Sequence, residues 1–152
     1  MKKVFLLMLV AGLTLSFSSC SEDNNNSTPG DSVTMRVGGV QKTFDTVVVT
    51  ETPYTQDGVE YVDLLVVASM SGNPDETLTF GGGKGYTGSG NTWGFYYRLN
   101  GVEYHEDELA NPLSSNITVN SDNHFVGTFS GQVTSSANTT VDITEGTFDV
   151  TY

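Results

Sequence analysis

The stretch VEYVDLLVVASM, from Val59 to Met70, carries the clearest structural signal in the chain. Side chains alternate between the two faces of a β-strand, so every second residue shares a face. Five apolar residues share one face of this stretch: Val62, Leu64, Val66, Ala68 and Met70. The other face adds three further apolar residues: Tyr61, Leu65 and Val67. We therefore expect a central strand that is covered on both sides.

The same period of two, punctuated by turn residues, continues on both sides of this strand. SVTMRVGGVQKTFDTVVVT, residues 32–50, indicates two strands joined by a tight turn at Gly38-Gly39. A second hairpin is predicted at Asn100-Gly101, because both central residues of such a turn need positive φ angles. The chain is rich in Gly, Thr and Val and has no sustained helical periodicity after its N-terminus. These patterns predict an all-β fold, either an antiparallel β-sandwich or a flattened β-barrel.

The C-terminal segments complete this prediction. Phe125, Phe129 and Val133 alternate toward the interior. Two later groups of apolar residues have opposite parity: Val141 and Ile143 in the first, and Phe148, Val150 and Tyr152 in the second. One extra residue near Glu145-Gly146 would place them on a common face, which is what a β-bulge does. We expect the last strand to be an integral part of a single domain spanning residues 33–152.

The net charge of −12 limits the partners of this domain. An acidic surface repels phosphate backbones and anionic lipids, so we expect no nucleic-acid partner. Contact with a membrane would then require a covalent lipid.

The N-terminus offers a place for that lipid. Lys2 and Lys3 precede an apolar run over residues 4–15, which is the length of a secretory signal and short for a transmembrane helix. The sole cysteine, Cys20, follows in the stretch FSSC, which resembles a bacterial lipobox. The resemblance implies a signal peptide over residues 1–19 and an acylated Cys20 at the head of a polar tether over residues 20–32. The alternative is a stray cysteine beside an ordinary cleavage site.

The residues after Cys20 refine the expected location. Ser21, Glu22 and Asp23 resemble the export signal of surface lipoproteins of the Bacteroidota. The resemblance implies a protein anchored in the outer membrane that faces outward, whereas the alternative is a polar linker without sorting content. The stretch FVGTFSGQV…VDITEGTFDVTY also resembles the C-terminal hairpin of small all-β lipoprotein domains of unknown function from the same bacteria. That family implies no reaction.

Several stretches are candidate sites of chemistry. His105 precedes an acidic run formed by Glu106, Asp107 and Glu108, which could hold a metal ion but is more typical of a solvated loop. GGGKGYTGSG lacks the glycine and the Ser/Thr spacing of a phosphate-binding loop, and no GxSxG motif is present. Together with Glu103, the acidic run could supply a glycosidase pair, although small β-domains rarely build deep clefts. We expect no enzyme activity, no metal and no cofactor.

The stretch YTGSGNTWGFYY, residues 86–97, is the most suggestive for binding. In a regular strand Trp93, Phe95 and Tyr97 would share one face, and Tyr86 lies in the preceding glycine-rich segment 81–91, which we expect to be a flexible loop. Such aromatic rings either stack on a ligand or belong to the core. Two functions follow: a non-catalytic surface module that binds a glycan or a protein, or a structural envelope lipoprotein without a small-molecule site. An exposed Trp93 would favour the first.

Two short motifs indicate modification. Asp31-Ser32-Val33 and Asp45-Thr46-Val47 resemble the O-glycosylation sites of exported Bacteroidota proteins. Ser32 is expected to be accessible at the end of the tether, and Thr46 less accessible in the middle of a strand.

Overall fold

A computed structural model describes residues 30–107 and 111–152, and these form an all-β, antiparallel fold. The described residues contain eleven strands. The strands are β1 (Ser32–Val37), β2 (Val40–Phe44), β3 (Thr46–Gln56), β4 (Val59–Met70), β5 (Asn73–Gly83), β6 (Gly88–Ser89), β7 (Thr92–Leu99), β8 (Val102–His105), β9 (Ser114–Ser121), β10 (His124–Ser135) and β11 (Thr140–Thr151). Within these residues we find no helix with the length and apolar character needed to cross a bilayer.

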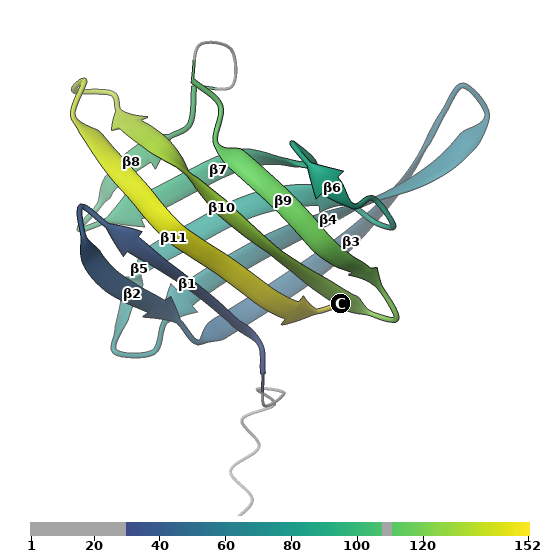
Figure 1. The fold of residues 1–152 in the computed structure, drawn as a ribbon, viewed down its shortest axis with the longest axis horizontal. Coiled ribbons are helices and arrows are strands. Elements are labelled where there is room, and N and C mark those ends of the chain that lie inside the picture. The colour runs from purple at the N-terminus through teal and green to yellow at the C-terminus, as the bar shows by residue number, and fades with distance from the viewer. Residues whose placement is uncertain (1–29, 108–110) are drawn as a thin grey trace, which may run out of the picture.

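The strands form two layers that cross at an angle (Figure 1). Their hydrogen-bonded order is β2-β1-β11-β10-β8-β7-β5-β4-β3, with β9 paired to β10 and the short β6 paired to β9. β8 joins the layers on one side because it pairs with both β7 and β10. The path does not close between β2 and β3, so the fold matches the predicted sandwich or flattened barrel without being a closed barrel.

The predicted hairpins at Gly38-Gly39 and Asn100-Gly101 are both confirmed, with positive φ at all four residues. However, the strand expected to run on from residue 40 to residue 50 is broken at Asp45. β2 lies in one layer and β3 in the other, so the chain changes layer within one residue. Asp45 is fixed there by Ser71, whose Oγ and backbone N donate to its carboxylate at 2.6 and 2.7 Å. These bonds hold the pKa of Asp45 below its ordinary value.

The core lies between the layers and is dominated by phenylalanines. Phe80 of β5 reaches across to Phe125, Phe129 and Phe148, with ring centroids 5.1 to 6.4 Å apart. Phe125, Phe129 and Val133 point inward as predicted, and β11 lies between β1 and β10 as an integral strand.

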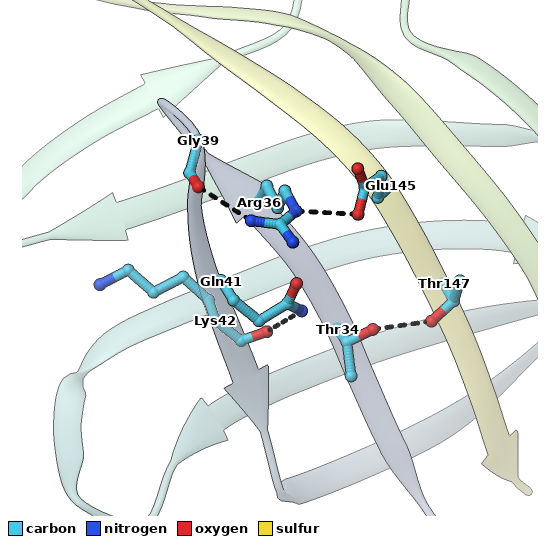
Figure 2. A network of polar contacts seen from close by, with 7 residues as sticks. All are labelled: Thr34, Arg36, Gly39, Gln41, Lys42, Glu145 and Thr147. Carbon is cyan, nitrogen blue, oxygen red and sulfur yellow. Dashed lines mark hydrogen bonds and ion pairs between the residues drawn. The ribbon is translucent and has the colours of Figure 1, made fainter.

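The predicted bulge in β11 is also confirmed. Glu145 has a φ of 51°, and the register of β11 shifts at this point against both β1 and β10. Arg36 of β1 donates through Nε to Glu145 at 2.8 Å and through Nη1 to the Gly39 carbonyl at 3.1 Å (Figure 2). Thr34 and Thr147 share a hydroxyl hydrogen bond of 2.8 Å beside it. The bulge thus keeps both halves of β11 facing the core.

The strand Val59–Met70 is central in pairing, between β3 and β5, but it is not covered on both faces. Leu64, Val66 and Ala68 are buried, whereas Leu65 and Val67 are 44% and 39% exposed. The expectation of two covered faces is therefore wrong, because the second face is the outside of the sandwich.

The hairpin between β3 and β4 extends beyond the body of the domain (Figure 1). It turns at Asp57-Gly58, both with positive φ, and every residue from 51 to 60 is exposed. Where this hairpin meets the body, its outer face carries the aromatic side chains that form the candidate site.

Candidate functional site

Trp93 lies on the outer face of the sandwich and is 42% exposed. It does not share a face with Phe95 and Tyr97, which are buried in the core, so the predicted aromatic face is wrong. The reason is a bulge in β7: between the paired positions Thr79–Tyr96 and Gly81–Trp93, β7 has one residue more than β5. Gly94, with a φ of 63°, takes up that extra residue.

Tyr97 instead belongs to a buried polar cluster. Its hydroxyl donates to Glu76 Oε1 at 2.6 Å, and Lys42 Nζ lies 3.0 Å from the same oxygen. Glu76 is 2% exposed. Burial, followed by the hydrogen bond to Glu76, raises the pKa of Tyr97 far above its ordinary value. Since Lys42 comes from β2 and the other two residues come from the opposite layer, the cluster ties the layers together, and Tyr97 itself is fully buried.

The glycine-rich segment begins inside β5 and not in a loop. Gly81 and Gly83 face outward beneath two aromatic rings: a Cβ built on either would lie 2.7 Å from a ring atom of Trp93 or Tyr86, respectively. Gly82 faces inward, where a Cβ would lie 2.5 Å from Phe125. The absence of side chains therefore lets aromatic rings lie against the sheet on both of its faces.

The segment from Gly83 to Tyr86, which we expected to belong to a flexible loop, is held by hydrogen bonds. The buried Asn120 of β9 donates through Nδ2 to the Gly83 carbonyl at 2.7 Å and to the Tyr86 carbonyl at 2.9 Å. The backbone N of Lys84 donates to the Val62 carbonyl at 2.8 Å. Tyr86, which is 50% exposed, is thus placed by its backbone at the edge of the outer face.

These elements surround a cavity of about 310 Å³. It is lined by Tyr54, Gln56, Tyr61, Val62, Asp63, Gly83, Tyr86, Asn91 and Trp93. We call this set the aromatic cleft. Tyr54 and Tyr61 are cross-strand partners whose rings stack with centroids 5.4 Å apart and planes inclined by 22°. The volume is at the lower end of the range of small-molecule sites, large enough for one ring-sized group.

Among the described residues that line the aromatic cleft, Asp63 alone is charged. It lies on β4 next to Gly83 of β5, between the tyrosine pair and Trp93. Partial burial and then the nearby Asp63 carboxylate raise the pKa of the Tyr54 hydroxyl. The cleft therefore combines aromatic walls, the amides of Gln56 and Asn91, and one negative charge.

Glu106, the first residue of the acidic run after β8, has a structural role. Glu106 accepts hydrogen bonds from the backbone N of Phe95 at 2.8 Å and of Leu113 at 3.1 Å. His105 packs edge-on against Tyr96 at 4.7 Å. The described residues contain no group of three His, Cys, Asp or Glu placed to hold a metal ion. Glu108 lies outside the described residues.

The predicted modification sites have different outcomes. Ser32 is the first residue of β1 and is half-buried opposite Asp149, so it belongs to the domain and not to the tether. Thr46 is the first residue of β3 and is exposed, so its expected low accessibility is wrong. Cys20, Ser21, Glu22 and Asp23 lie outside the described residues.

Comparison of the chain with protein-family models, curated proteins and solved structures finds no match. The site must therefore be interpreted from its own geometry.

Sequence reasoning named Trp93 and Tyr86 but missed the other lining residues, among them Tyr54, Tyr61 and Asp63. A signal for them is present in the sequence. Asp57-Gly58 is a leading two-residue hairpin turn, and pairing outward from it places Tyr54 opposite Tyr61. With this turn, the tyrosine pair is predictable; its proximity to Trp93 is not.

Proposed function

We propose that this protein is a non-catalytic, lipid-anchored surface module that binds carbohydrate through the aromatic cleft. The observation that carries the proposal is the exposure of Trp93 beside Tyr54, Tyr61 and Tyr86 in one cavity. Large aromatic side chains on the outside of a small domain are costly unless they meet a partner, and their faces suit apolar contacts.

The polar groups of the cleft fit the same ligand class. A sugar ring presents C–H groups on its faces and hydroxyls around its rim. Aromatic walls can stack on the faces, while the Asp63 carboxylate and the amides of Gln56 and Asn91 can exchange hydrogen bonds with hydroxyls. A mostly apolar cleft with a few placed polar groups is the usual form of a small-molecule site.

The non-catalytic part of the proposal rests on the same lining. Glycoside hydrolysis usually requires two carboxyl groups flanking the bond that breaks. Asp63 is the one carboxylate among the described residues that line the aromatic cleft. As formed by the described residues, the cleft is therefore suited to holding a sugar and does not supply the second carboxyl group that cleavage usually needs.

The anchored location rests on the sequence resemblances at Cys20 and at Ser21, Glu22 and Asp23. In Figure 1 the domain begins at the bottom of the view, at the start of β1, while the β3–β4 hairpin projects at the upper right. A tether ahead of β1 would leave the hairpin free to meet an extracellular ligand. The alternative, a structural envelope lipoprotein, is less favoured because it gives the exposed Trp93 no role.

A glycan-array screen of the purified full-length protein tests the proposal. We expect binding to a restricted set of glycans, lost in Trp93→Ala and kept in Tyr96→Ala, a residue on the same strand and face that does not line the cleft. Absence of glycan binding by the parent protein would contradict the proposal and favour the structural alternative.

A further inference from the structure

We propose that the aromatic cleft is selective for a sugar that carries a protonated amino group, such as glucosamine within a glycan chain. This inference rests on the proposed carbohydrate binding and adds the chemical class of the sugar. It is carried by the relation between the Asp63 carboxylate and the four aromatic rings around it.

The cleft carries a negative charge at Asp63. Within the described residues the Asp63 carboxylate forms no hydrogen bond or ion pair, and no Lys, Arg or His lines the cleft. Lys84, the basic residue of the neighbouring glycine segment, is engaged elsewhere: its Nζ lies 3.0 Å from Glu51 and 4.6 Å from the ring centroid of Tyr152. A negative charge without a partner, partly withdrawn from water, favours a cationic group at this place.

The aromatic walls of the cleft also favour a cation. The faces of Tyr and Trp rings carry negative electrostatic potential and attract an ammonium group within about 6 Å. Three tyrosines and one tryptophan contribute to this one cavity. Asp63 lies centrally among them, since it lines both the aromatic cleft and the adjoining hollow beside Trp93 and Leu65. An ammonium group in the cleft would be attracted by the carboxylate and by the rings together.

Acidic and neutral sugars match the charge of the cleft less well than an amino sugar. A uronic acid or a sulfated sugar would place its negative charge beside Asp63, on a protein whose net charge is already −12. A neutral sugar could stack on the rings but would leave the carboxylate with hydroxyl partners alone. Gln56 and Asn91 still provide hydrogen bonds for the remaining hydroxyls, which distinguishes an amino sugar from a simple ammonium ion.

Three oligosaccharides with the same β-1,4-linked backbone test this selectivity. Six-unit oligomers of glucosamine, of N-acetylglucosamine and of glucose differ at C2. In mildly acidic buffer, in which the titrations are run, this carbon bears an ammonium, an acetamido or a hydroxyl group. We expect the full-length protein to bind the glucosamine oligomer at least about tenfold more tightly than either neutral oligomer in calorimetric titration. Titration at about 0.15 M salt limits attraction by distant surface charges.

The variant Asp63→Asn should remove this preference. Asp75→Asn is the matched control: it changes the net charge equally, lies exposed near the start of β5 and is absent from the cleft. Three results would overturn the inference and leave carbohydrate binding standing. The first is equal affinity for the three oligomers, and the second is failure of the glucosamine oligomer to bind while other glycans bind. The third is a preference that Asp63→Asn and Asp75→Asn alter equally. If no glycan binds at all, the proposed function itself fails.

Discussion

The indole of Trp93 lies against Gly81 of the neighbouring strand, so closely that a Cβ added to this glycine would come 2.7 Å from Nε1. The next residue, Gly82, has the same relation to Phe125 on the opposite face, at 2.5 Å. Two adjacent glycines thus serve two different surfaces: Gly81 makes room for the cleft and Gly82 makes room for the core.

Alanine substitution of these two glycines should separate binding from stability. Gly82→Ala drives a methyl group into a fully buried ring, and overpacking of this kind costs about 1–3 kcal/mol of unfolding free energy. Gly81→Ala meets an exposed indole that can rotate away, so stability should change little while glycan affinity falls. Urea melts and glycan titrations of both variants check this. A stability loss in Gly81→Ala as large as that in Gly82→Ala would contradict the assignment of faces.

The buried Tyr97 predicts a loss of stability in alkali. Its folded-state pKa is raised above the ordinary value of 10.0, so the native state keeps a proton that the unfolded state releases. The unfolded state then binds fewer protons than the native state. The contribution of Tyr97 to the free energy of unfolding therefore falls by about 1.4 kcal/mol per pH unit above about pH 10.

Tyr97→Phe tests this contribution. At neutral pH the variant should be less stable by about 1–3 kcal/mol, because the buried Glu76 loses a donor. It should lose less stability than the parent as pH rises from about 8 to about 11, so the two curves converge. Urea melts across this range provide the measurement, and parallel curves for the two proteins would contradict the prediction.

The C-terminal strand predicts a contrast between neighbouring residues. Phe148 is 1% exposed and lies 4.7 Å from Phe125 and 5.1 Å from Phe80, ring centroid to centroid. Phe148→Ala should therefore cost about 3–5 kcal/mol. Asp149 faces solvent, with His124 Nδ1 at 3.7 Å, and Asp149→Ala should cost little. Similar urea midpoints for both variants and the parent would refute this register.

The anchoring proposal depends on one atom, the Cys20 sulfur. Cys20→Ala removes the thiol that would carry the lipid, and multiple acyl chains are what make such anchoring stable. We expect the variant to leave the membrane fraction on cell fractionation, with Ser21→Ala remaining in it as the control. Unchanged membrane association of Cys20→Ala would contradict the proposal.

The sequence predicts those parts of the fold that depend on local rules. Strand periodicity and turn chemistry predict three such features: the alternation in β10 and β11, the positive-φ turns at Gly38-Gly39 and Asn100-Gly101, and the bulge at Glu145-Gly146. The break at Asp45 does not, because its partner Ser71 is 26 residues away in the chain. A change of layer at a single residue leaves the alternation of neighbouring residues nearly intact.

Only part of the candidate site could be predicted, because local rules identify single residues and not their tertiary neighbours. The sequence identifies Trp93 as a residue to watch, but regular alternation assigns it to the core side of β7 with Phe95. The bulge at Gly94 reverses that assignment, and a glycine in a strand gives no sign of which way its neighbours turn. The convergence of Trp93, Tyr54 and Asp63 depends on the pairing of β4, β5 and β7, which only the tertiary structure supplies.

Carbohydrate binding at the aromatic cleft is tested most directly by titrating the best glycan from the array into the parent protein, Trp93→Ala and Tyr96→Ala. A tryptophan at the centre of a binding site often contributes about 2 kcal/mol or more, so Trp93→Ala should weaken binding by at least about tenfold. Tyr96→Ala, altered on the same face of β7 but outside the cleft, should bind as the parent does. Equal affinity of the parent and Trp93→Ala would contradict the account.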